Sequence, residues 1–158
     1  PPIFAVQPGQ TQVVRMLLRP RPGADKERAF RLLFDEIPKP GAGTVNVALR
    51  ISVPAFVAAP GNAAPELQWR TERQGSAMQL VLTNTGRRHV RINELLASAP
   101  SGQRLAPKLL DPNPYVLPGG KRHWALGALS RSLASGASLQ LSGQTNTGPL
   151  NVALPPSR

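Results

Sequence analysis

The sequence predicts an all-β protein, and three observations support this fold class. Proline and glycine account for 18 and 14 of the 158 residues, which favours many short elements joined by turns. Residues 44–57 alternate apolar with small or polar side chains at a strict spacing of two, the period of a β-strand with one apolar face. Turn signals then recur through the second half at the spacing of a β-sandwich.

The first part of the chain is expected to hold three short elements before that alternating strand. Residues 3–6 form a short apolar piece, and residues 11–18 are a β-strand candidate. Residues 29–37 have a period that fits either a helix or a strand, and two prolines end them. The glycine-rich turn at 41–43 is short, so this element and the strand at 44–57 should pair antiparallel.

The alternating strand is the most informative stretch because its apolar side chains need a partner. Its run ends at Pro54, which cannot donate a hydrogen bond to a central ladder. Near a sheet edge, both the side chains and the unpaired backbone must be covered, either by the chain's own core or by another protein. The five apolar positions, called the apolar stripe below, are Val45, Val47, Leu49, Ile51 and Val53.

A domain boundary is expected within residues 58–65, which carry no charge and no large side chain. This divides the chain into domains at residues 1–60 and 61–158. The second domain should be a sandwich of short strands, with no internal repeat. The strands are expected near residues 67–73, 78–83, 89–96, 105–110, 115–117, 123–129, 139–141 and 150–154.

The net charge of +11, from 19 basic and 8 acidic residues, would attract anionic partners, nucleic acid first among them. The charges are scattered along the sequence, however, and the seven aromatic residues do not interleave with the basic pairs as a base-stacking platform would. A solvated, arginine-rich surface is therefore the favoured interpretation, and nucleic acid is not expected as a partner. No apolar run is long enough to cross a bilayer, so membrane insertion is not expected either.

No catalytic, metal or cofactor site is predicted. The absence of cysteine excludes a disulfide framework and a cysteine-ligated metal. His89 and His123 are the only histidines, and neither belongs to a metal-binding or nucleophile motif, so both are expected to be surface or strand residues. Trp69 and Trp124 are expected to anchor the core or its edge. The sequence therefore predicts a protein that is not an enzyme.

Four pieces of the first 60 residues, in order, resemble the periplasmic chaperones of the chaperone–usher pilus pathway. The second half is consistent with that family, although its motifs are weaker. The short connection before the alternating strand resembles the short-loop or archaic branches. The four pieces are Pro1-Pro2-Ile3-Phe4 with Pro8-Gly9, Gln12-Val13-Val14-Arg15, Arg31 to Pro38 ending in Glu36-Ile37-Pro38, and the strand ending in Val53-Pro54-Ala55-Phe56-Val57.

The resemblance implies two immunoglobulin-like β-sandwich domains set at an angle, and a function without catalysis. In that family, the last strand of the first domain lends alternating apolar side chains to an incomplete pilin subunit, which is donor-strand complementation. The apolar stripe would then be the pilin-binding site, with pilin subunits and an outer-membrane usher as partners and the periplasm as the location. The alternative for the stripe is that it completes the chain's own sandwich.

Two departures from the family pattern lead to further expectations. The family's first domain begins about three strands earlier, so the first domain is expected to be partial, with open edges that favour a homodimer. The family's cleft lysine would fall at Ala58, and Arg50 lies on the face opposite the stripe, so the usual cation pair is not visible. Two other functions stay open: a basic β-fold nucleic-acid-binding module, and a surface adhesin or structural β-sandwich subunit.

Overall fold

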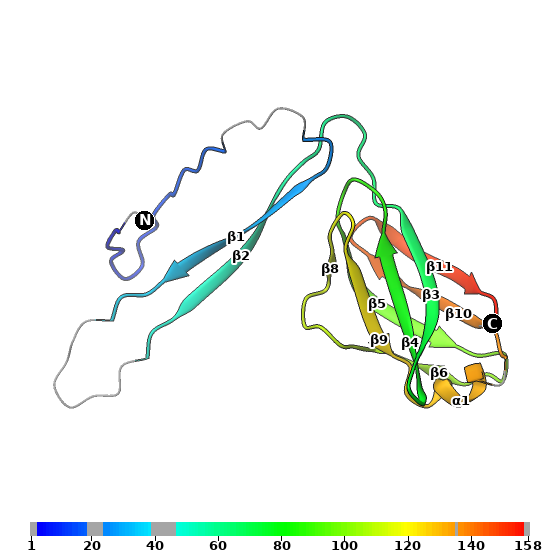
Figure 1. The fold of residues 1–158 in the computed structure, drawn as a ribbon. Helices are drawn as coiled ribbons and strands as arrows, with labels where there is room; N and C mark the ends of the chain where they lie inside the picture. Colours follow the sequence, from blue (N-terminus) through cyan, green and yellow to red (C-terminus); the bar gives the residue numbers. More distant parts are fainter. Residues whose placement is uncertain (1–2, 19–23, 39–46, 135, 157–158) are drawn as a thin grey trace.

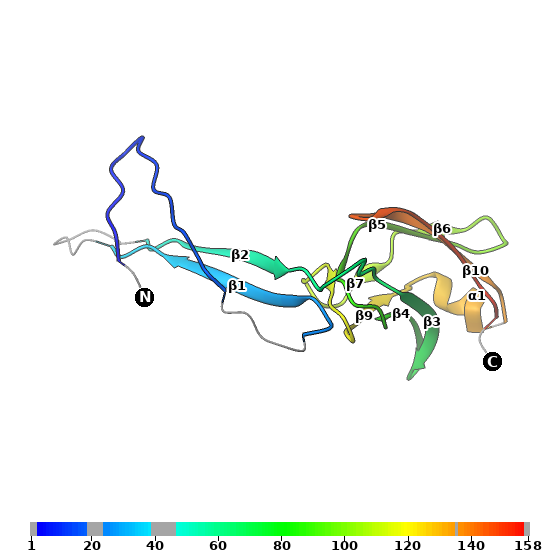
Figure 2. The same ribbon diagram turned by 90° about the horizontal axis from the view of Figure 1, so that it is seen from above.

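The computed structural model describes residues 3–18, 24–38, 47–134 and 136–156. Across these residues nearly all of the regular secondary structure is β, with antiparallel strand pairs and one six-residue helix, which confirms the predicted fold class. Figure 1 shows a long two-stranded hairpin on one side and a two-sheet sandwich on the other. Seen from above in Figure 2, the hairpin extends away from the two packed sheets.

The hairpin consists of β1 (Arg28–Asp35) and β2 (Arg50–Val57), paired antiparallel along their whole length. The element at 29–37 is therefore a strand, and the expected antiparallel connection is confirmed. The strand predicted at 11–18 is wrong, because residues 3–18 form no ladder with another segment. Apolar side chains at a strand-like spacing do not make a strand unless a neighbouring backbone satisfies its N–H and C=O groups.

Pro54 lies inside β2 rather than at its end, which corrects the sequence-based expectation. Glu36 N donates to Leu49 O at 2.8 Å, so this pair is of the hydrogen-bonded type. Pair types alternate along an antiparallel ladder, and counting along the register places Arg31 and Pro54 in a pair without mutual hydrogen bonds. The ring nitrogen of Pro54 therefore points away from β1, and the ladder loses no bond there.

The sandwich is built from two antiparallel sheets. One sheet has the order β11-β10-β5-β6, with β8 also paired to β5, and the other has the order β3-β4-β9-β7. The elements are β3 (Leu67–Gln74), β4 (Ala77–Asn84), β5 (Val90–Ser98), β6 (Arg104–Leu105), β7 (Lys108–Leu109), β8 (Tyr115–Val116), β9 (Lys121–Ala125), α1 (Leu129–Ala134), β10 (Leu139–Thr145) and β11 (Gly148–Leu154).

The strands expected in the second half are present except the single one at 105–110, which is divided into β6 and β7 in different sheets, and the sequence did not predict α1. The strand expected at 123–129 ends at Ala125, and the chain then turns into the short helix. Leu129 and Leu133, four residues apart, share one helical face and are both buried. This spacing was the available signal, and it was too short to outweigh the strand pattern.

The core lies between the two sheets of the sandwich and under α1. Trp124 is buried in it and Trp69 packs against its edge, with ring centroids 5.5 Å apart, as expected for anchors of the core. By contrast, the hairpin contributes no residue to this core cluster. The largest fully buried apolar side chains are Leu80, Leu82, Leu126, Leu129, Leu133, Leu139, Leu141, Val81, Val90 and Val116.

Candidate functional site

The two faces of the β1–β2 hairpin differ sharply in chemistry. Residues directly opposite one another in an antiparallel pair project to the same face. Leu32 pairs with Val53 and Phe34 pairs with Ile51, so these four side chains share a face with Phe30. This set is called the apolar hairpin face below. Ile51 and Val53 are 50% and 40% exposed, so much of this apolar surface meets solvent.

The apolar stripe continues before β2, where its exposure increases. Val47 is 82% exposed and Leu49 is 59% exposed. Val45 lies outside the described residues. The structure thus places Ile51 and Val53 beside apolar side chains of β1, and it places Val47 and Leu49 in the more open segment that leads into the strand.

The opposite face of the hairpin carries polar side chains that connect its two strands, together with Leu33, which is 54% exposed. Arg50 donates to both carboxylate oxygens of Asp35, at 2.5 and 3.0 Å, and Arg31 donates to Ser52 Oγ at 3.1 Å. The hydrogen bond from Arg50 lowers the pKa of the Asp35 carboxyl below its ordinary value; desolvation opposes this, and the guanidinium charge adds to it. Arg50 therefore lies on the face opposite the stripe, as expected, and its guanidinium is paired with the Asp35 carboxylate.

A buried hydrogen-bonded pair, Glu27 and His89, anchors the start of the hairpin to the sandwich. The Glu27 side chain is only 3% exposed, and its Oε1 lies 2.5 Å from Nδ1 of His89 and accepts from the backbone N–H of His89 at 3.1 Å. Nε2 of His89 faces Nδ2 of Asn146 at 3.4 Å. An imidazole that donates from Nδ1 and accepts at Nε2 satisfies both neighbours, which locks the ring in place.

An aromatic stack reinforces this buried pair from the end of β2. The ring of Phe56 is stacked on His89, with centroids 3.8 Å apart and an interplanar angle of 17°. Tyr115 meets the same imidazole edge-on at 5.6 Å and Phe56 at 5.2 Å. The three rings join β2, β5 and β8 at one point. The residues of this contact, Glu27, Phe56, His89 and Tyr115, are called the junction below.

Arg87 ties the two segments that flank the hairpin to the same end of the sandwich. Its guanidinium donates to Asp25 O at 2.6 Å and to Pro60 O at 3.2 Å. Its carbonyl accepts from Glu27 N at 2.9 Å. Both chain ends of the hairpin are therefore held by one side chain, so the hairpin cannot swing about a single connection without breaking several hydrogen bonds.

Asn84, at the end of β4, is the buried polar hub beneath the junction. Its Nδ2 donates to the carbonyls of Arg88 and Val116 at 2.7 and 3.0 Å, and its Oδ1 accepts from Glu66 N and Gly86 N at 3.2 and 3.0 Å. The side chain uses its full hydrogen-bonding capacity while it is fully buried. It fixes the linker, the β4–β5 turn and β8 against one another.

Gly86 allows the linker to approach this turn closely. A Cβ at this position would lie 2.5 Å from the carbonyl oxygen of Ala64 and 2.8 Å from the carbonyl carbon of Pro65. No larger residue fits unless the linker backbone moves, because the obstructing atoms belong to the main chain. The glycine thus lets the linker pack directly on the sandwich.

Sequence reasoning missed the junction. His89 was expected to be a surface or strand residue, whereas it is 8% exposed and carries the buried contact to Glu27. The two partners are 62 residues apart in sequence, and no local spacing links them. The available signals were two weak ones: an acidic residue directly before the first hairpin strand, and one of only two histidines in the chain.

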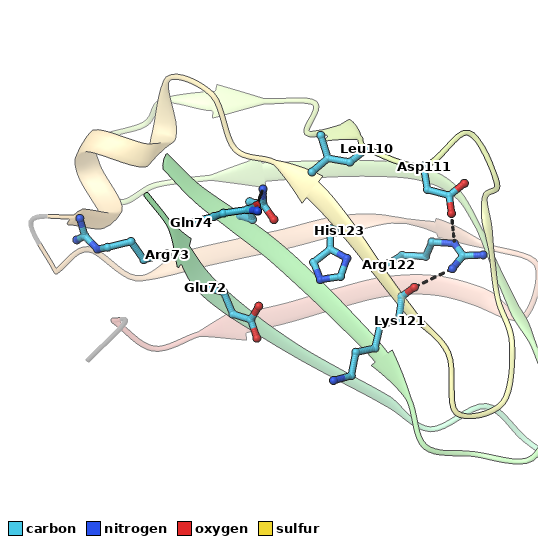
Figure 3. Close-up of a pocket in the computed structure, with 9 residues that line it drawn as sticks. Glu72, Arg73, Gln74, Leu110, Asp111, Lys121, Arg122 and His123 are labelled. Atoms are coloured by element: carbon cyan, nitrogen blue, oxygen red, sulfur yellow. Dashed lines mark hydrogen bonds and ion pairs between the residues drawn. The ribbon is translucent and has the colours of Figure 1, made fainter. Parts of the chain in front are cut away.

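His123 lies in a polar hollow on the outer face of the β3-β4-β9-β7 sheet, drawn in Figure 3. The same hollow contains Glu72 and Lys121, and Arg122 beside it lies 3.8 Å from Asp111. The lining includes no serine, threonine or cysteine that could act as a nucleophile. In the described part of the chain, no three His, Cys, Asp or Glu side chains gather as a metal site.

The described helix is also too short and too polar to cross a membrane.

The comparison with known families gives one match. Residues 1–62 match the family described as pili and flagellar-assembly chaperone, PapD N-terminal domain. The chain's resemblance to pilus chaperones is confirmed by this match, which covers the hairpin and ends in the linker. Comparison with curated proteins gives no match.

Proposed function

We propose that this chain is a periplasmic chaperone that holds pilin subunits by donor-strand complementation and delivers them to an outer-membrane usher. The family match supports a chaperone of pilus or flagellar assembly. The single observation that carries the finer proposal is the apolar stripe, which is exposed from Val47 to Val53 on one face of a strand. We further propose the domain division at residues 1–60 and 61–158, which falls between the end of β2 and the start of β3.

The backbone of β2 supports a strand-addition mechanism. Because Ile51 and Val53 belong to hydrogen-bonded pairs with β1, the N–H and C=O groups of Arg50 and Ser52 point to the other edge of the strand. That edge is unpaired in the described two-stranded sheet. An incoming pilin strand would pair with these groups while the stripe fills the pilin's open core.

Pro54 would set the limit of this pairing. Its nitrogen also points to the free edge, but it carries no hydrogen to donate. Strand addition along β2 would therefore stop at Pro54, and the pilin would pair with the half of the strand that carries Leu49, Ile51 and Val53. The remaining half, which contains Phe56, would stay with the chaperone's own junction.

The stripe is large enough to dominate the affinity. Complete burial of an aliphatic side chain contributes about 1.5–3 kcal/mol. The four described stripe residues are between 40% and 82% exposed, so a corresponding share of each contribution is still to be gained on binding. The total is roughly 4–7 kcal/mol before the entropy of association is subtracted.

The direct test is capture of the cognate pilin by a chaperone with a charged stripe. Replacing Leu49 and Ile51 by Asp places two carboxylates where the pilin core would close, and co-purification of the pilin should be lost. The matched control replaces Ala48 and Ser52 by Asp, which adds the same charge to the same strand on its other face. Undiminished capture by the stripe variant, or equal loss in both variants, would contradict the proposal.

The exposed hairpin also supports the proposal of a homodimer when no pilin is present. The apolar hairpin face and the free edge of β2 would pair with the same surfaces of a second copy. Light scattering at increasing protein concentration should then show a dimer that disappears when pilin is added. A monomer at all concentrations would exclude this dimer while leaving the pilin-capture test unaffected.

A further inference from the structure

Four basic side chains from separate segments gather at the end of the sandwich that is remote from the hairpin. They are Arg73 of β3, Arg104 of β6, Lys108 of β7 and Arg131 of α1, and all four are exposed. We call them the distal basic end. Figure 1 shows the β3–β4 turn, β6 and α1 together at this end. In the sequence these residues are separated and look like scattered surface charges, so the cluster is a product of the fold.

Hydrogen bonds and strand register place two of these residues beside one another. Arg73 lies opposite Met78 in the β3–β4 ladder. The backbone N–H of Met78 donates to Oγ of Ser130 at 3.2 Å, and Ser130 directly precedes Arg131 in α1. The last residues of β3 and the helix are therefore neighbours across Met78.

The β6–β7 segment completes the distal basic end. Lys108 lies opposite Ala125 in the register of β7 and β9. Leu105, next to Arg104, has its Cδ2 atom 3.7 Å from the place where a Cβ of Gly127 would lie. Both cations therefore flank the short connection between β9 and α1, on the side of the molecule where Arg131 emerges.

The acidic residues of the sandwich are paired with other arginines or lie away from this end. Residues 63–158 contain four of them. Glu72 and Asp111 line the same hollow as Arg73, but each forms its ion pair with an arginine outside the distal basic end, Arg70 and Arg122. Glu66 lies at the start of β3, at the opposite end of the domain, and Glu94 pairs with Gln144 in the middle of its sheet. Within the described residues, none of the four cations makes a salt bridge, so their positive potential is directed to solvent.

We propose that the distal basic end docks the protein on the surface of a membrane that carries anionic phospholipids. The four cations come from four separate segments that belong to both sheets and the helix, so a broad polyanionic surface can contact them together, which a single extended strand cannot. Both tryptophans pack in or against the core, and Tyr115 lies in the junction, so no described aromatic side chain at this end could stack on bases. Each basic residue near such a surface strengthens attachment by about fivefold.

Docking in this way would orient the hairpin. The linker and the junction meet the sandwich at the Leu67 end of β3, whereas Arg73 lies near its other end. Eight residues of strand span roughly 23 Å. A molecule that rests on its distal basic end would therefore hold the apolar stripe away from the lipid, with the free edge of β2 accessible to a protein partner.

The test is sedimentation of the full chain with vesicles. Binding is measured at low salt with pure phosphatidylcholine and with a three-to-one mixture of phosphatidylcholine and phosphatidylglycerol. The variant Arg73→Gln with Lys108→Gln should bind the anionic vesicles about 30-fold less tightly, at about fivefold per charge. The control Arg15→Gln with Lys26→Gln removes the same net charge from exposed residues that precede the sandwich and should bind nearly as well as the unmodified protein.

Each outcome decides the proposal. Selective loss in the Arg73 and Lys108 variant, with attachment that weakens as salt rises, supports it. Equal loss in both variants would mean that only net charge matters, and absence of binding to anionic vesicles would also overturn the proposal. Tighter binding to duplex DNA or to polyglutamate than to the vesicles, at equal charge concentration, would assign the distal basic end to nucleic acid or to an acidic protein instead. Pilin capture is not involved, so failure here leaves the proposed function standing.

Discussion

Removing the Glu27 carboxylate should detach the hairpin from the sandwich. The change Glu27→Ala deletes the acceptor for the backbone N–H of His89 at 3.1 Å and for its Nδ1 at 2.5 Å. Both donors are then left buried without a partner. Breaking a buried pair in this way costs about 3–5 kcal/mol, and the lower value applies here because the stacked Phe56 ring remains.

A loss of about 3 kcal/mol corresponds to a roughly 100-fold increase in local opening. Hydrogen exchange should report it at the backbone N–H of residue 27, which donates to Arg87 O, and at the N–H of His89. Exchange in the centre of the sandwich, at Leu82 for example, should change little, because the core cluster contains no hairpin residue. The matched control is Asp25→Ala, which removes an exposed carboxylate two residues before Glu27 and keeps the backbone carbonyl that accepts from Arg87.

A double-mutant cycle with His89→Ala distinguishes a specific pair from a general loss of packing. Partners in direct contact should give an interaction free energy of about 1–3 kcal/mol. Additive effects of Glu27→Ala and His89→Ala, or unchanged exchange at residues 27 and 89, would refute the view that this pair anchors the hairpin.

Three further predictions concern the strand, the hub and the acid sensitivity of the hairpin. Pro54→Val should restore a donor on the free edge of β2 and increase self-association, measured by light scattering; an unchanged monomer fraction would contradict the edge-limiting role. Asn84→Ala removes four hydrogen bonds and should lower the free energy of unfolding in urea by about 3 kcal/mol, and a loss below about 1 kcal/mol would disagree with the hub. The lowered pKa of Asp35 means that its pairing with Arg50 contributes above the unfolded-state value of about 3.9 and is lost as the pH falls through the folded-state pKa; Asp35→Asn should abolish this step in hairpin exchange.

The sandwich was largely predictable from sequence because its signals are local. Turn residues and short apolar runs placed most strands from β3 to β11 near their observed positions, but they predicted one strand at 105–110 where β6 and β7 lie in different sheets. The helix α1 was not predicted because its signal, the spacing of Leu129 and Leu133, spans barely more than one turn. The pairing order of the strands was not predicted, since it depends on contacts between segments far apart in the chain.

The apolar stripe of the hairpin and the position of Arg50 were predictable from sequence, but the contacts that hold the hairpin on the sandwich were not. Alternation identified the stripe, and the same alternation correctly placed Arg50 on the opposite face. The junction could not be found this way, because Glu27 and His89 meet only when the linker folds Phe56 back onto the sandwich. A long-range buried pair leaves no periodic trace in the sequence, whereas a strand leaves one at every second residue.

The two explanations of the stripe, its own core or another protein, are compatible once exposure along the strand is considered. Exposure falls steadily from Val47 at 82% through Leu49 and Ile51 to Val53 at 40%, and the residues after Pro54 are half-buried up to Phe56 in the junction. Pro54 marks the change, because it removes the only donor that the free edge would offer at that point. The second half of β2 thus holds the hairpin on the sandwich. The first half keeps both an apolar face and an unpaired backbone, the two properties that an incoming strand requires.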